Sequence, residues 1–214
     1  MNRLSVSFIL TSALCLPALS SSVLAADSDR LEFLLSHVST LKADVTQLIV
    51  ESNGGVLEES TIKMKLKKPD GFYWETIEPF PELIVTDGIK LWNYQPDLEQ
   101  VVVEDWQTDQ SELAAQLLSG RTDSLNQEYT ITLAQVDAGA ENFTLTPKAA
   151  DDVNANIVIQ FIESGLDAIY INSKNGEQTV WQFSQLEINT PLSDSEFYFE
   201  PPEGIEVIEN SYGQ

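Results

Sequence analysis

Residues 65–99 have the sequence KLKKPDGFYWETIEPFPELIVTDGIKLWNYQPDLE, and this stretch decides the fold class of the chain. It contains closely spaced turn signals: Lys-Pro-Asp-Gly at 68–71, Pro79 and Pro81, Asp87-Gly88, and Gln95-Pro96-Asp97. The segments between the turns are short and rich in aromatic and β-branched residues, which is typical of consecutive strands joined by tight turns. We therefore predict a strongly bent β-sheet that carries its large aromatic residues, Phe72, Trp74 and Trp92, on one face.

The rest of the chain continues this pattern and adds two short helices. Ile62, Met64 and Leu66 alternate with lysines, so one face of that strand is apolar and the other faces water. Leucines at helical spacing predict helices over 27–38 and 112–118. Strands are predicted over 43–50, 62–67, 71–78, 82–86, 89–95, 98–103, 128–136, 141–147, 156–163, 166–172, 178–189 and 196–199.

The first 25 residues have the layout of a secretory signal peptide. A short basic start is followed by an apolar run and by small residues that end at Ala25. A membrane anchor is the alternative, but Pro17 and the serines interrupt the run well short of about 20 apolar residues. Cys15, the single cysteine, would leave with the signal. We expect cleavage after Ala25, one domain over 26–214, and a periplasmic location in a Gram-negative bacterium.

Charge narrows the range of partners. The chain carries a formal net charge of −23. Loss of the signal segment, whose only charged residue is Arg3, makes the net charge −24. Such a chain repels nucleic acid and anionic membrane surfaces, whereas a basic protein partner would be attracted. The lysines at 63, 65, 67 and 68 form a cluster, and for most of them a solvated strand face is the expected environment.

The motifs of enzyme chemistry are missing from the sequence. It has one histidine, His37, no Gly-rich phosphate loop, no His-Glu helix motif and no Gly-x-Ser-x-Gly elbow. A pair of carboxylates remains open as a hydrolase site, although 34 acidic residues make such a pair uninformative. We expect no catalytic residues, no metal site and no cofactor.

Binding is the remaining class of function. Several predicted strands are apolar on both faces, for example Ile157, Ile159 and Phe161 against Val158 and Ile162. One face can form a core, and the second face needs a cover, which is either the helices or a guest. A container for an apolar ligand and an ordinary filled core are both consistent with this pattern.

The central stretch resembles the family of outer-membrane lipoprotein carriers, LolA. The resemblance rests on Lys67-Lys68-Pro69, Phe72-x-Trp74, Leu83-Ile84-Val85-x-Asp87-Gly88, Leu91-Trp92-x-Tyr94-x-Pro96, Glu99-Gln100, Phe143-x-Leu145-Thr146-Pro147-Lys148-Ala149 and Phe197-x-Phe199-x-Pro201-Pro202-x-Gly204-Ile205. It implies a mainly β protein, an incomplete barrel of about eleven antiparallel strands with a lid of short α-helices over a hydrophobic cavity. The two predicted helices would form that lid.

The resemblance also implies a function and a set of partners. Family members accept lipoproteins from an ABC transporter complex in the inner membrane, shield the acyl chains, and deliver the cargo to an outer-membrane receptor. We expect triacylated lipoproteins as cargo and a monomeric carrier. A periplasmic sensor or regulatory domain of the same fold, which transfers no cargo, is the alternative.

The acyl-chain cavity and its latch are the candidate site. By position in the family pattern, Phe72 and Trp74 should line or gate the cavity. Further expected lining residues are Ile62, Met64, Leu66, Trp92, Leu117, Leu118, Phe143 and Phe161. Family members have an arginine where this chain has Lys68, and it is held to keep the lid closed. Because lysine lacks the planar donor fork of arginine, we expect a looser lid or a different latch.

Overall fold

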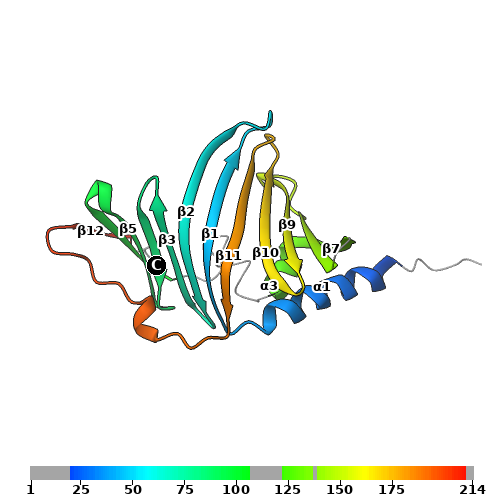
Figure 1. Ribbon diagram of the computed structural model, residues 1–214, viewed down its shortest axis with the longest axis horizontal. Helices are drawn as coiled ribbons and strands as arrows, with labels where there is room; N and C mark the ends of the chain where they lie inside the picture. Colours follow the sequence, from blue (N-terminus) through cyan, green and yellow to red (C-terminus); the bar gives the residue numbers. More distant parts are fainter. Residues whose placement is uncertain (1–19, 107–121, 137–138, 211–214) are drawn as a thin grey trace, which may run out of the picture.

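The computed structural model describes residues 20–106, 122–136 and 139–210. Their strands form one twelve-stranded sheet with the order β12-β6-β5-β4-β3-β2-β1-β11-β10-β9-β8-β7 (Figure 1). The strands are β1 (Thr40–Val50), β2 (Val56–Lys67), β3 (Gly71–Glu78), β4 (Glu82–Thr86), β5 (Lys90–Gln95), β6 (Gln100–Asp105), β7 (Tyr129–Val136), β8 (Ala140–Pro147), β9 (Asn154–Ile162), β10 (Gly165–Ser173), β11 (Gln178–Ile188) and β12 (Glu206–Asn210).

The sheet is strongly curved and does not close. Its two ends are β12 and β7, which lie at opposite sides of the molecule (Figure 1). Register shifts interrupt the pairing of β1 with β11 between Lys42 and Asp44, and the pairing of β1 with β2 beside Val50. Such irregularities bend and twist a strand. The predicted unclosed sheet is confirmed, with the difference that β12 pairs with β6 in the parallel direction.

The described residues include two α-helices, α1 (Ser20–Ser36) and α3 (Thr122–Glu128). Helix α1 begins earlier than predicted and lies along the β7–β10 side of the sheet (Figure 1). Helix α3 was not predicted. The predicted helix over 112–118, with Leu117 and Leu118, lies outside the described residues. Neither described helix is long and apolar enough to cross a membrane.

Two elements near the C-terminus differ from the prediction. The expected strand at 196–199 is wrong, because Asp194–Phe197 forms a 3₁₀-helix, η4. Ser193 and Glu196 close a capping box around it, and these hydrogen bonds satisfy backbone donors that a strand would have paired elsewhere. Strand β12 was missed. Its sequence EVIEN is short and acidic, as is common for a strand at a sheet edge.

Register assigns each residue of the bent sheet to one of two faces. Residues directly opposite each other in neighbouring strands share a face. Met64 pairs with Trp74 and Trp74 with Ile84, which places these three on the inner, concave face. Lys65, Tyr73, Val85 and Trp92 form the adjacent row and therefore lie on the outer face.

The prediction that Trp92 shares a face with Phe72 and Trp74 is therefore wrong. Trp92 belongs to a second, smaller cluster with Val85 and Val101 on the outer face. The C-terminal segment covers this cluster, since Tyr198 contacts the ring of Trp92, and Phe199 and Ile205 pack nearby. The position of Trp92 is structural, and it does not line the inner face.

Two of the clustered lysines hold the C-terminal segment on the outer face. Lys65 Nζ lies 3.0 Å from Glu196 Oε2 and 4.7 Å from the centre of the Tyr73 ring. Lys67 Nζ donates to Asp194 Oδ1 at 2.5 Å and to the Leu192 carbonyl at 2.8 Å. The side chain of Lys63 is 57% exposed, as expected, whereas those of Lys65 and Lys67 are 23% and 31% exposed. The expectation that most of the clustered lysines lie on a solvated strand face therefore holds for Lys63 and is wrong for Lys65 and Lys67.

Phe197 is the apolar anchor of the same segment. It is 2% exposed, and a Cβ atom added at Gly71 would lie 3.2 Å from its ring, so the missing side chain of Gly71 makes room for it. We expect Phe197→Ala to lower the free energy of unfolding by about 3–5 kcal/mol, the usual effect of removing a buried aromatic ring. Urea unfolding measures this. The matched control is Tyr198→Ala, which removes a ring that is 61% exposed and should cost much less. Equal losses would contradict the anchoring role of Phe197.

Candidate functional site

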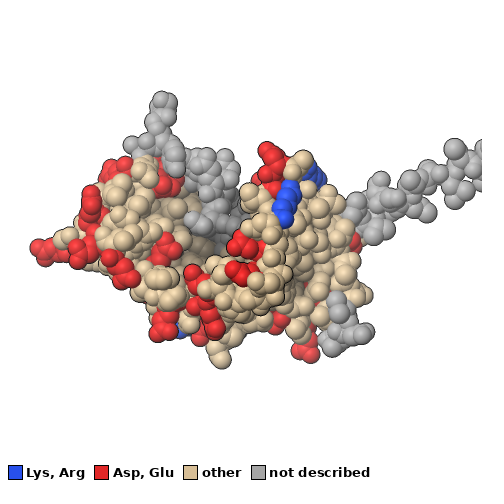
Figure 2. Space-filling view, turned by 90° about the horizontal axis from the view of Figure 1, so that it is seen from above, with Lys and Arg blue, Asp and Glu red and all other residues tan. Residues whose placement is uncertain are grey.

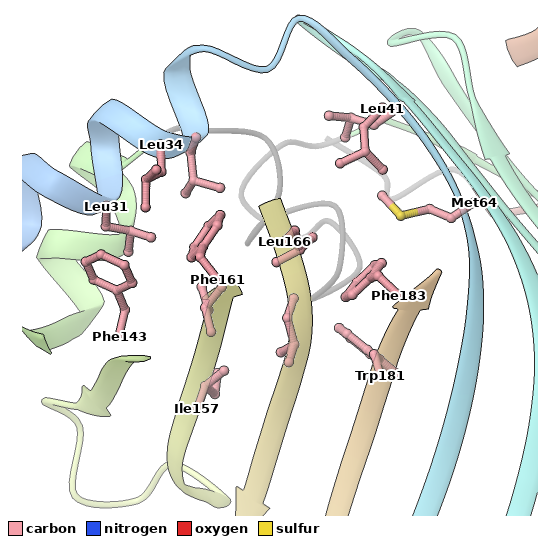
Figure 3. Packing of buried hydrophobic residues seen from close by; sticks show 14 of the residues in the cluster. Leu31, Leu34, Leu41, Met64, Phe143, Ile157, Phe161, Leu166, Trp181 and Phe183 are labelled. Carbon is pink, nitrogen blue, oxygen red and sulfur yellow. The ribbon is translucent and has the colours of Figure 1, made fainter. Parts of the chain in front are cut away.

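The inner face of the sheet carries one continuous apolar cluster. It brings together most of the predicted lining residues: Ile62, Met64, Leu66, Phe72, Trp74, Phe143 and Phe161. All of these side chains are buried. They come from the separate strands β2, β3, β8 and β9, and the curved sheet directs them to one cluster. Figure 3 shows Met64, Phe143 and Phe161 among the residues of this interior.

An aromatic group occupies the centre of this cluster. The rings of Phe72 and Trp74 stack with centroids 6.2 Å apart, and Trp74 meets Trp181 edge to face at 5.3 Å. Trp181 donates its indole N–H to Gln47 Oε1 at 2.8 Å, so its polar atom is satisfied inside the cluster. Trp181 and its neighbour Phe183 were not among the predicted lining residues. Trp181 and Phe183 alternate with polar residues along β11, and this alternation was the sequence signal that could have identified them.

Helix α1 covers another part of the inner face. Leu31, Leu34 and Leu35 belong to the cluster and are 0%, 6% and 3% exposed. Figure 3 shows Leu31 and Leu34 pointing from the helix into it. Phe143 and Phe161 lie beneath the helix and pack edge to face at 5.8 Å. A small cavity of about 20 Å³ remains here, lined by Leu34, Leu35, Val38, Leu41, Phe161, Ser164, Leu166 and Ile188. This part of the inner face is packed as a core.

Lys68 contacts the C-terminal end of α1. Its Nζ donates to the Leu35 carbonyl at 2.6 Å, and its backbone N–H donates to the Ser39 carbonyl at 2.9 Å. The last four carbonyls of a helix have no partner within the helix, and the helix dipole favours a cation at this end. Burial lowers the pKa of the Lys68 ammonium below its ordinary value.

Asn189 holds the segment that follows α1. Its side-chain oxygen accepts hydrogen bonds from the Ser39 N–H at 2.7 Å and from the Ser39 hydroxyl at 2.8 Å. Its amide donates to the His37 carbonyl at 2.9 Å. Asn189 adopts a left-handed backbone conformation with φ of 59°, which asparagine tolerates better than most residues. This contact could not be seen in the sequence, because about 150 positions separate its partners.

The middle of α1 is held by an ion pair with β8. Arg30 donates to both carboxylate oxygens of Glu141, at 3.0 Å and 2.7 Å. Two parallel bonds of this kind are the strong form of the arginine–carboxylate contact. The Arg30 hydrogen bond holds the pKa of Glu141 below its ordinary value, and the same hydrogen bond raises the pKa of Arg30.

Two buried polar atoms on the β5–β6 side have no hydrogen-bond partner in the described structure. They are Asn93 Oδ1 and Trp106 Nε1. Asn93 follows Trp92 along β5 and therefore faces inward, and Trp106 packs against the inner cluster. A buried polar atom without a partner costs free energy, so each one calls for an explanation.

A second cavity lies at the β2–β3 turn and has several charged residues in its lining. Its volume is about 210 Å³, and it is lined by Lys67, Lys68, Pro69, Asp70, Gly71, Asp87, Asp194 and Phe197. Across the described residues, no group of three or more His, Cys, Asp and Glu side chains is placed to hold a metal ion. The apolar inner face described above can enclose apolar groups, and this is the chemistry that the site supports.

Comparison with known proteins agrees with a carrier of apolar groups. The chain matches the family model "Outer membrane lipoprotein carrier protein LolA" over residues 36–200. It is 36% identical over 195 residues to an outer-membrane lipoprotein carrier protein of Chromohalobacter salexigens, covering 91% of this chain and 92% of that protein. The protein of the same name from Hahella chejuensis is 34% identical over 200 residues, covering 93% and 96%.

The chain therefore belongs to the outer membrane lipoprotein carrier family, a family of carriers and not of enzymes. This confirms the resemblance found in the sequence. Among solved structures, a DUF1329 family protein from Desulfovibrio piger matches with a TM-score of 0.50 and 15% identity, over 82% of this chain and 97% of that one. A likeness at this identity concerns the fold alone.

The ion pair on α1 makes a pH-dependent contribution to stability that can be measured. Because the folded-state pKa of Glu141 lies below its ordinary value of 4.5, its stabilisation is complete above that value and is lost as pH falls through the folded-state pKa. We expect Glu141→Gln to lower the free energy of unfolding by about 1–3 kcal/mol at pH 7. The difference from the unsubstituted protein should shrink at pH 3.

Urea unfolding at the two pH values tests this. The matched control is Glu187→Gln, which removes the partner of Lys42 in a pair whose side chains are both 49% exposed. Exposed pairs contribute little, so the control should change stability by less than about 1 kcal/mol. A loss on Glu141→Gln that is the same at pH 7 and pH 3 would contradict the assignment.

Proposed function

We propose that this protein is a periplasmic carrier that shields the acyl chains of lipoproteins between the inner and outer membranes. The observation that carries the proposal is the continuous apolar inner face in a chain of the lipoprotein carrier family. Transfer of an acyl chain from water to an apolar surface is worth about 0.8 kcal/mol per CH₂ group. A large apolar lining therefore supports binding tight enough to keep a lipid chain in solution.

The route of the cargo is part of the same proposal. The protein is exported, loses residues 1–25, accepts triacylated lipoproteins from an ABC transporter complex of the inner membrane, and delivers them to an outer-membrane receptor. Acidic side chains gather over the part of the surface formed by β5, β6 and β12 (Figure 2). Such a surface favours a receptor with a basic docking face.

Native mass spectrometry of the exported protein tests the carrier function. The protein is incubated with spheroplasts that release lipoproteins, and the soluble fraction is analysed. We expect a soluble one-to-one complex with a triacylated lipoprotein. Addition of the receptor should then remove the cargo, more slowly at high salt. A folded protein that forms no complex, while a known carrier does so in parallel, would favour the sensor function. A transfer rate independent of salt would contradict electrostatic docking.

We further propose that Lys68 acts as the latch that keeps α1 seated on the sheet. Its hydrogen bond to the Leu35 carbonyl supports this role. A bond from a charged donor is worth about 1.5–3 kcal/mol, which corresponds to roughly a tenfold or greater shift between seated and displaced helix. A displaced α1 would expose Leu31 and Leu34, and the enlarged apolar surface would retain cargo.

We therefore expect Lys68→Leu to slow transfer of cargo to the receptor, because a larger fraction of the molecules would have α1 displaced. Transfer is followed by the appearance of lipoprotein on the receptor. Lys68→Arg keeps a donor and should retain most of the rate. Lys63→Leu is the matched control, because it removes the same charge from an exposed side chain. A normal rate for Lys68→Leu would rule out the latch.

A further inference from the structure

The inner face consists of two halves that differ in whether their buried polar atoms all have hydrogen-bond partners. The helix-covered half is formed by α1 and the inner faces of β7–β10. The wing half is formed by the inner faces of β2–β6. In Figure 1 the first lies on the right and the second on the left.

In the helix-covered half, α1 is fixed near its middle by three polar contacts to three different elements. Arg30 forms its paired bonds with Glu141 on β8. Ser28 donates to Asn126 Oδ1 on α3 at 2.8 Å, and Asp27 accepts from the Leu133 N–H on β7 at 3.0 Å. The last contact also occupies a backbone donor of the edge strand. Rotation of α1 away from the sheet would break all three together.

The C-terminal end of α1 is fixed as well. Lys68 holds the Leu35 carbonyl, and Asn189 holds His37 and Ser39. These contacts come from the turn after β2 and from the end of β11, on separate sides of the segment. A helix held at its middle and at its C-terminal end, and buried along one face, is a fixed wall.

The helix-covered half also lacks room for a lipid chain. The cavity under α1 measures about 20 Å³, close to the space that one water molecule needs. Phe143 and Phe161 are 0% and 3% exposed and fill the space below the helix. An acyl chain would have to displace these rings as well as the polar contacts.

The wing half differs because its buried polar atoms are not all paired. Asn93 Oδ1 and Trp106 Nε1 are the buried side-chain atoms without a partner in the described residues, and both face this half. One is an acceptor and the other a donor. The acylated cysteine of a lipoprotein carries the complementary groups, an amide N–H and carbonyls of esters and an amide.

We propose, building on the carrier function, that the acyl chains are accepted on the wing half while α1 stays seated. Trp106 donates its indole N–H to a carbonyl of the acylated cysteine, and Asn93 accepts from an amide N–H. The chains lie along the partly buried apolar residues of the same half, Ile84 and Val102, which share the inner face with Asn93. Phe143 and Phe161, which were expected to line the cavity, belong to the fixed core beneath α1.

A reversible cross-link tests whether α1 moves. Residues 26–214 contain no cysteine, so Arg30→Cys combined with Glu141→Cys gives a unique pair of thiols in the exported protein. A bismaleimide with a reducible disulfide ties α1 to β8. Binding of a triacylated lipopeptide is measured before cross-linking, after it, and after reduction. We expect dissociation constants within twofold of each other. A tenfold or greater loss on cross-linking that reduction restores would overturn the fixed wall.

Binding of the lipopeptide by the protein without the cross-link distinguishes a failure of this inference from a failure of the carrier function. If it binds no lipopeptide, the carrier function fails before the position of α1 is tested. If it binds, a loss that appears on cross-linking and disappears on reduction concerns α1 alone.

A conservative substitution tests the polar contact. Trp106→Phe removes the indole N–H and keeps an aromatic ring. We expect about fivefold weaker binding of the triacylated lipopeptide and unchanged binding of a long-chain alkyl probe that lacks esters and amides. The matched control is Trp181→Phe, whose N–H is already bonded to Gln47 and should not distinguish the two probes. Equal effects of Trp106→Phe on both probes, or none on either, would overturn the contact.

Discussion

A sheet with an apolar inner face is stable in water when that face is covered. Here β7 and β12 end the sheet without pairing to each other in the described structure, so closure into a barrel does not bury the inner face. On one half the cover is α1, which buries three leucines against Phe143 and Phe161. Full burial of a leucine side chain is worth about 1.5–3 kcal/mol, so the three leucines together hold α1 firmly against the sheet.

The polar contacts of α1 have a different role from its leucines. Apolar burial holds the helix against the sheet and does not fix its direction, because hydrophobic contact is not directional. The Arg30–Glu141 pair acts near the middle of α1 and the Lys68–Leu35 bond at its C-terminal end, and together they fix the direction. The outer face follows the same logic, since Phe197 supplies burial while Lys65 and Lys67 position the segment that carries it.

The sequence predicted the strands well and their mutual placement less well. Turns at Asp87-Gly88 and Asn175-Gly176 and the alternation around Met64 are local signals, and they set most strand positions within a few residues. Alternation gives the relative faces within one strand, but a turn breaks this relation. Trp74 and Trp92 were therefore assigned to one face, and the registry through β4 separates them. Contacts such as Arg30–Glu141 join distant segments and have no local signal at all.

A carrier that passes its cargo on has to bind strongly and still release. A half filled with its own side chains contributes stability and takes no cargo, so its packing does not vary with loading. A half with an unpaired buried donor and acceptor carries a free-energy cost when empty, which cargo with complementary groups relieves. The free-energy difference between the empty and the loaded receptive half, rather than total apolar area, sets the affinity for an acylated cysteine. Division of one apolar face into a fixed part and a receptive part thus lets stability and affinity be adjusted separately, and β1 and β11, which lie between the parts, join them into one sheet.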